Sequence, residues 1–195
     1  MRNAPCTHLK FLISGKIRTE LINASGKIKI IEEFKAPNVI APNHLFGTST
    51  KFPYDIFAVE DTSIMQIDKP TFISLMQNEE VFLINMLNIT SYRSQRSLDS
   101  FSYPTSGDMK EKLANWILNF TNRKGENIRI VCKQKDLYTF FGVQRTVFMH
   151  ALNELKQNNV IDFNMKEITI QNRLALQEYG NALEEITYYH PSIKD

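Results

Sequence analysis

The sequence predicts an α+β protein, because three segments of different pattern follow one another along the chain. Residues 1–70 form short apolar runs broken by glycine and proline, which is typical of strands. Residues 71–101 contain neither glycine nor proline, which favours one long helix. Residues 109–172 then show the patterns of a helix, a strand, two short helices and a hairpin.

The composition is that of an ordinary globular protein. The chain has 195 residues, of which 43% are hydrophobic and 23% charged, and its formal net charge is +2. A chain of this length can bury a core without disulfides or metal, and Cys6 and Cys132 lie too far apart for a C-x-x-C motif. No apolar run approaches the roughly 20 residues that span a bilayer, and no signal peptide opens the chain. We therefore expect a cytoplasmic protein with no membrane contact, no metal site and no cofactor.

The N-terminal strands are predicted at residues 8–22 and 27–34, where branched and aromatic side chains are frequent. Residues 24–26 form the turn between these runs, which predicts a hairpin. Residues 55–68 are predicted to supply another strand pair, with Glu60-Asp61 as its turn. Strands this short and closely spaced suggest a sandwich, a roll or a barrel.

Residues 71–101 are predicted to form a helix through which two copies of the chain associate. Its main stripe consists of side chains spaced three or four positions apart: Phe82, Met86, Ile89 and Arg93. Leu83 and Leu87 provide a second apolar edge. A helix with apolar side chains on two faces has two surfaces to cover, and a second subunit could cover one of them. A plain core helix is the alternative.

Residues 102–108 are a compositional break, which predicts a boundary between a domain at 1–101 and one at 102–195. Asp108 resembles the cap of a helix that Gly125 closes. Two short helical runs then meet at Gly142, where the absence of a Cβ permits a positive φ. Helix, strand, two helices and hairpin, in that order, is the arrangement of a winged helix-turn-helix.

The second of these short helices, about residues 144–157, is predicted to be a recognition helix. Phe148, Ala151, Leu152 and Leu155 recur at helical spacing and so bury one face. The opposite face carries side chains of types that can read base edges in a major groove. Its members are Gln144, Arg145, Thr146, Met149, His150 and Asn153.

Three segments resemble the cyclic-AMP receptor protein and FNR family of bacterial transcription regulators. KDLYTFFGVQRTVFMHALNELKQNNVI (135–161) and the hairpin after it resemble the family's DNA-binding domain, and HLKFLISGKIRTELINASGKIKIIEEF (8–34) resembles its β-roll. Residues 72–101 resemble its dimerisation helix. The resemblance implies a homodimeric regulator that binds double-stranded DNA and is not an enzyme, and it leaves RNA polymerase open as a partner.

The resemblance also implies roles for individual residues at the DNA interface. Arg145 falls on the family's guanine-reading arginine, whereas Thr146 and His150 differ from its best-known member, so the preferred operator need not be the familiar one. Three lysines fall near positions that the family uses for contacts to the DNA backbone, which orient the protein without reading sequence. They are Lys133, Lys135 and, on the wing, Lys166.

The effector site departs from the family's pattern. A helix and a first strand pair that the family has upstream are missing here, which implies an incomplete β-roll with an open edge. In IAPNHLFGTSTKFPYDIF (40–57), Phe52-Pro53 stands where the family has an Arg-Ser pair that binds the cyclic phosphate, and Lys51 is the one cation nearby in the sequence. Each lost charge-assisted bond is worth about 1.5–3 kcal/mol. We therefore expect an effector that is neutral or absent, and not cyclic AMP.

The residues expected to line an effector pocket are Asn43, His44, Phe46, Phe52 and Tyr54. The iron–sulfur centre of the FNR branch is excluded, because two distant cysteines cannot supply four ligands. Enzyme motifs such as G-x-S-x-G, H-E-x-x-H and the phosphate loop are absent from the sequence. An effector-free regulator, or a module whose winged helix binds protein, stays open as an alternative.

Overall fold

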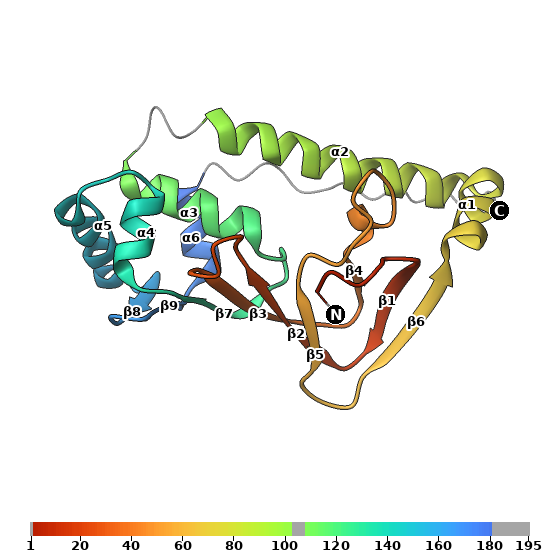
Figure 1. Ribbon diagram of the computed structural model, residues 1–195, viewed down its shortest axis with the longest axis horizontal. Coiled ribbons are helices and arrows are strands. Elements are labelled where there is room, and N and C mark those ends of the chain that lie inside the picture. The colour runs from red at the N-terminus through yellow and green to blue at the C-terminus, as the bar shows by residue number, and fades with distance from the viewer. Residues whose placement is uncertain (1, 103–107, 181–195) are drawn as a thin grey trace, which may run out of the picture.

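The computed structural model describes residues 2–102 and 108–180. In Figure 1 the winged helix lies at one end and the β-roll at the other, with the long helix α2 above both. The strands are β1 (His8–Ser14), β2 (Lys16–Ile22), β3 (Lys29–Lys35), β4 (Asn38–Ile40), β5 (Asp55–Ala58), β6 (Ser63–Asp68), β7 (Glu126–Val131), β8 (Ile161–Phe163) and β9 (Glu167–Ile170). The helices are η1 (Pro42–His44), α1 (Lys69–Asn78), α2 (Glu80–Ser102), α3 (Met109–Phe120), α4 (Gln134–Phe140), α5 (Arg145–Gln157) and α6 (Arg173–Tyr179). Most of the predicted boundary, 103–107, and the end of the predicted DNA-binding domain, 181–195, lie outside the described residues.

Within residues 2–102 and 108–180, the strands form two antiparallel sheets, one in the order β4-β1-β6 and one in the order β5-β2-β3-β7-β9-β8. The predicted hairpin is confirmed, because β2 and β3 pair from Lys16↔Lys35 to Ile22↔Lys29. The side chain of Asn23 fixes its turn by accepting the backbone N–H groups of residues 27 and 28. Between β1 and β2 the chain passes from one sheet to the other at Gly15, whose φ is +84°.

The predicted pairing of residues 55–68 with one another is wrong, although both strands exist. β5 pairs with β2, and β6 pairs with β1 in the other sheet. The connection between them straddles the carbonyl of Lys16, which accepts the N–H of Val59 and the hydroxyl of Thr62. The connection therefore crosses from one sheet to the other at Lys16, and β5 and β6 run in different sheets from that point.

Among the residues that the structure describes, the buried apolar side chains form two cores, and the β2–β3 hairpin contributes to both. Ile17 and Phe34, at one end of the hairpin, are buried in the β-roll core with residues of α1 and α2. Ile28 and Ile30, at the other end, are 3% and 4% exposed and lie in the core of the winged helix. The hairpin therefore crosses the predicted domain boundary as one continuous structural piece.

The helix predicted over 71–101 is broken at Glu79, whose extended backbone separates α1 from α2. In a straight helix, residues ten positions apart lie about 15 Å apart along the axis. The rings of Phe72 and Phe82 meet edge to face with their centroids 6.4 Å apart. The two rings can pack in one core only because the chain bends between them.

The winged helix-turn-helix is confirmed. Asp108 caps α3 by accepting the backbone N–H groups of Lys110 and Glu111, although α3 ends at Phe120 and not at Gly125. Gly142 separates α4 from α5 at a φ of +64°. None of the helices within residues 2–102 and 108–180 is long and apolar enough to cross a membrane. The two cysteines are buried and unpaired, and no cluster of three metal-binding side chains occurs in this described part of the chain.

Candidate nucleic-acid interface and effector pocket

Helix α5 presents one face to the core and the other to solvent. Phe148, Leu152 and Leu155 are fully buried, as the periodicity predicts. The opposite face is exposed and consists of Gln144, Arg145, Thr146, His150 and Asn153. Met149 was predicted to lie on the exposed face. It is half-buried against the core and lies at the edge of that face.

The turn before α5 is held rigidly, which fixes the direction of the helix. The N–H of Gly142 donates to the carbonyl of Thr139, and that of Val143 donates to the carbonyl of Tyr138. The ring of Phe148 stacks on Phe141, with centroids 6.3 Å apart and planes 27° apart. The apolar residues on both sides of Gly142 therefore decide where the exposed face of α5 points.

Two hydrogen bonds join the tip of the wing to the start of α4. The N–H of Cys132 donates to the carbonyl of Lys166 at 2.9 Å, and the side chain of Gln134 donates to the carbonyl of Asn164 at 3.0 Å. The predicted backbone-contacting lysines, at 133, 135 and 166, are thus brought onto neighbouring segments, and all three are exposed. Cations on such neighbouring segments can follow a DNA backbone.

One carboxylate on α5, that of Glu154, pairs with Lys110, which sequence reasoning missed, and lies beside His150, which it assigned to the DNA-reading face. Glu154 Oε2 lies 3.0 Å from Lys110 Nζ and 3.4 Å from His150 Nδ1. Lys110 also pairs with Asp108 at 3.2 Å, and hydrogen bonds to Glu154 first and Asp108 second raise the pKa of this lysine. The spacing of His150 and Glu154, four residues apart on one helix, was the sequence signal for this contact.

The predicted effector pocket is only partly assembled as expected. Arg93 donates from Nη1 to Asn43 Oδ1 at 2.9 Å. Burial and then the nearby charge of Arg93 lower the pKa of His44. Burial raises the pKa of the half-buried Tyr54 to about 12, while the charge of Arg93 opposes that rise. Asn43, His44 and Tyr54 therefore gather around a guanidinium that sequence reasoning had assigned to the dimer stripe, and Lys51 is not the only cation near them.

The two phenylalanines of the predicted pocket both make packing contacts, but to different extents. Phe52 is 2% exposed and belongs to the β-roll core. Phe46 packs on Phe72 of α1 with ring centroids 6.5 Å apart, and Lys69 lies over its ring. Phe52 is therefore a core residue, which corrects the prediction for it. Phe46 is half-buried, and its place in an effector pocket stays a prediction.

The exposed stripe of α2 differs from the predicted one. Met86 is 9% exposed and Phe82 packs beside it against the β-roll of the same chain. Leu83 and Leu87, the second apolar edge, are 40% and 51% exposed. The surface that α2 offers to another molecule is thus centred on the two leucines, one residue round the helix from the predicted stripe. Of the other two members of that stripe, Ile89 is half-buried and Arg93 is exposed.

Comparisons with known proteins match both halves of the chain. A family model for the cyclic nucleotide-binding domain matches residues 1–79, and one for the Crp-like helix-turn-helix domain matches residues 111–179. No curated protein matches the chain.

Among solved structures, the chain is similar to FixK2 from Bradyrhizobium japonicum, with 14% identity, 94% of this chain and 92% of that chain covered, and a TM-score of 0.49. A transcriptional regulator from Thermotoga maritima is 24% identical over 53% of this chain and 81% of that chain, with a TM-score of 0.48. The Catabolite Activator Protein of Thermus thermophilus is 16% identical over 91% of this chain and 83% of that chain, with a TM-score of 0.46. These TM-scores are below 0.5, so the family of this chain is inferred from the two family models and not from the solved structures.

Proposed function

This chain belongs to the CRP/FNR family of transcription regulators, which are not enzymes, and we propose that it binds a palindromic operator as a homodimer. It binds DNA through its Crp-like helix-turn-helix. The exposed apolar edge of α2, Leu83 and Leu87, is the observation that supports the homodimer. Apolar side chains of this size in an unpaired stripe on a long helix are stabilised when a second helix covers them.

In the proposed complex, α5 enters the major groove with its N-terminal residues toward the base edges. Arg145, the first residue of α5, is exposed and of the type that binds guanine through two hydrogen bonds. Two copies related by a twofold axis would place their recognition helices about 34 Å apart, one turn of DNA. A palindromic operator matches that symmetry.

The stoichiometry of the complex tests this proposal. We expect two chains per duplex on a palindrome selected from random DNA, and a dimer in sedimentation at micromolar concentration. Leu87→Glu should give a monomer, and loss of the second binding event should lower the affinity for the palindrome by roughly 100-fold or more. Leu174→Glu is the matched control, because Leu174 is 75% exposed on α6 in the other half of the molecule. A monomeric wild type with one chain per duplex would refute the homodimer.

We further propose that the effector is not cyclic AMP. The residue at the family's phosphate-binding arginine is Phe52, which is buried in the core, and Pro53 after it has no N–H to donate. A buried phosphate needs a paired cation or several donors. Arg93 supplies a positive charge nearby, but from α2 and in a bond to Asn43.

Calorimetry with cyclic AMP at millimolar concentration is therefore expected to give no saturable heat. Saturable heat with the wild type would contradict the proposal. The Arg93→Ala variant would then show whether Arg93 takes the place of the missing arginine, because only in that case would the heat disappear with it.

A further inference from the structure

Strand β3 joins the two halves of the molecule. One of its edges pairs with β2 and the other with β7, where Ile30 faces Ile130 and Glu33 faces Glu126. The register between β3 and β7 shifts between Ile31 and Glu33, where β7 advances three residues and β3 only two, while Glu32 stays opposite Thr19 of β2. The irregularity therefore lies on β7, and Glu32 reaches the C-terminal half of the molecule through its own side chain.

Glu32 is buried in the turn that follows α3. Its side chain accepts the N–H of Asn122 at 2.6 Å, and the residue is only 8% exposed. A Cβ on Gly125 would lie 2.5 Å from Glu32 Oε2, so the turn can approach this carboxylate only because residue 125 has no side chain. Burial raises the pKa of Glu32 to about 7, while the Asn122 bond and the charge of Arg173 oppose that rise.

Arg173 of α6 holds the same turn from the other side. Its guanidinium donates to the hydroxyl of Thr121 at 2.7 Å and to the carbonyl of Arg123 at 3.2 Å. The turn at residues 121–125 is thus clamped between β3 of one half and α6 of the other. Movement of the 121–125 turn relative to β3 would have to break the Glu32 contact.

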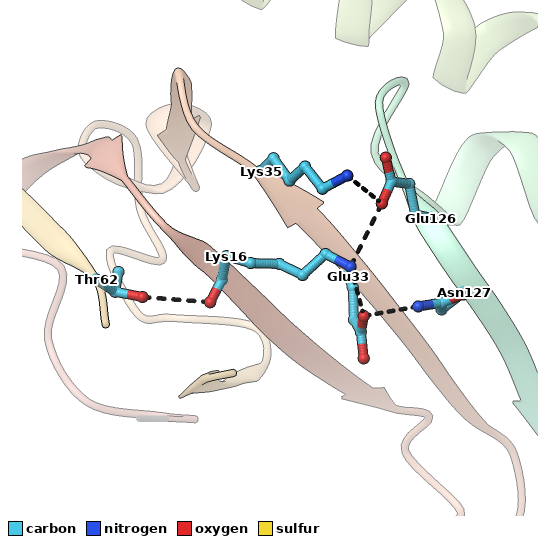
Figure 2. A network of polar contacts seen from close by, with 6 residues as sticks. All are labelled: Lys16, Glu33, Lys35, Thr62, Glu126 and Asn127. Atoms are coloured by element: carbon cyan, nitrogen blue, oxygen red, sulfur yellow. Dashed lines mark hydrogen bonds and ion pairs between the residues drawn. The ribbon is translucent and has the colours of Figure 1, made fainter. Parts of the chain in front are cut away.

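A network of charged side chains reinforces the junction on its outer side (Figure 2). Lys16 Nζ lies 3.1 Å from Glu33 Oε2 and 3.4 Å from Glu126 Oε2, and Lys35 Nζ lies 3.3 Å from that same Glu126 oxygen. Asn127 donates to Glu33 at 2.8 Å. Exposed ion pairs contribute little individually, but Lys16 and Glu33 are 15% and 18% exposed and belong to a connected set.

This junction leaves the DNA-reading face open. Arg145, Thr146 and His150 are exposed while the Glu32 contact is made, and the contact joins β3 to the turn that precedes β7. A contact that suppressed DNA binding by occlusion would have to cover those side chains. The Glu32 contact instead fits a role in setting the orientation of the winged helix relative to the β-roll.

We propose that Glu32 is a positioning residue for DNA binding, which holds the 121–125 turn against β3 and so fixes the separation of the two recognition helices in the dimer. The inference rests on the homodimer proposed above. If each winged helix is held rigidly on its β-roll, then binding of one recognition helix to its half-site places the other recognition helix at the second half-site. A loosened junction spreads the second helix over many positions and lowers its effective concentration there.

The test compares two duplexes: a palindrome selected from random DNA with the wild-type chain, and the same duplex with one half-site scrambled. Glu32→Ala should lower the affinity for the palindrome about 10-fold or more and leave the affinity for the single half-site within about twofold. It should also reduce the penalty for a spacer lengthened by one base pair. Glu32→Gln keeps the acceptor and the shape of the side chain, and is expected to restore the wild-type ratio of the two affinities.

Glu20→Ala is the matched control, because Glu20 lies on the same hairpin and pairs with Lys29 and Arg18, away from the 121–125 turn. Gly125→Ala disturbs the same contact from the side of the turn, because the new Cβ would crowd Glu32 Oε2. In the wild-type background it should lower the ratio of the affinity for the palindrome to that for the single half-site. In the Glu32→Ala background its effect should be smaller, as expected for residues that share one interaction.

An unchanged ratio for Glu32→Ala in a chain that sediments as a dimer would overturn the inference and leave the proposed function standing. An equal fall on both duplexes would also overturn it, because that pattern indicates general loss of the fold. A wild-type chain that sediments as a monomer would remove the homodimer itself, and the inference with it.

Discussion

Replacing Arg145 with alanine is expected to reduce the discrimination between the selected operator and random duplex by roughly 5- to 150-fold, which corresponds to about 1–3 kcal/mol. The side chain is exposed at the first residue of α5, where a guanidinium can reach a guanine edge in the major groove. The variant should lose affinity mainly for the operator. Competition binding at fixed salt, with each duplex in turn, measures the change.

Lys133→Ala is the matched comparison, because Lys133 is an exposed cation at the start of α4 with a proposed contact to phosphate. This variant should weaken binding to both duplexes alike and reduce the slope of log K against log salt by about one. Identical behaviour of the two variants on both duplexes would show that the roles assigned to Arg145 and Lys133 are wrong.

Replacing Gly15 with alanine is expected to lower the free energy of unfolding by roughly 3–5 kcal/mol, because the new methyl group has no room and the backbone is strained. A Cβ at this position would lie 2.3 Å from the carbonyl oxygen of Asp61 and 2.9 Å from the Cα of Thr62, and φ is +84°. Both neighbours are backbone atoms on the connection between β5 and β6, so neither can turn away as a side chain would. Urea denaturation measures the loss.

Gly26→Ala separates the clash from the strain. Gly26 also has a positive φ, +72°, but a Cβ there would meet nothing within 4 Å. The cost of the backbone conformation alone is about 1–2 kcal/mol. If both variants lose the same stability, then the connection at residues 61–62 adjusts to the methyl group and the crowding at Gly15 does not matter.

The features that could be predicted from the sequence depend on local spacing. The buried and exposed faces of α5 follow from the recurrence of Phe148, Leu152 and Leu155, and the turn before it follows from Gly142. The hairpin turn at residues 24–26 was likewise marked by its own residues. In each case a few neighbouring side chains decide the conformation, so the pattern carries the information.

The features that could not be predicted depend on contacts between distant segments. No glycine or proline near Glu79 marks the end of a helix in the sequence. The bend there brings Phe72 onto Phe82 in a shared core, a contact that local spacing does not reveal. Arg93 reaches Asn43 across fifty residues of sequence, so its periodicity on α2 suggested a dimer stripe and not a pocket. Strand periodicity identified β3 but could not show that its second edge pairs with β7.

The sharing of the β2–β3 hairpin between two cores also constrains the order in which the chain can fold. Ile30 and Ile130 are paired although one hundred residues separate them, so this part of the ladder closes a long loop. Long-range pairings of this kind slow folding, because the loop-closure entropy is lost before the contact forms. During synthesis the hairpin emerges first and can serve as a template on which β7 adds. A fragment that began at residue 108 would lack Ile28 and Ile30 from its core and would expose the edge of β7 that pairs with β3. It should therefore be less stable and aggregate more readily than the full chain.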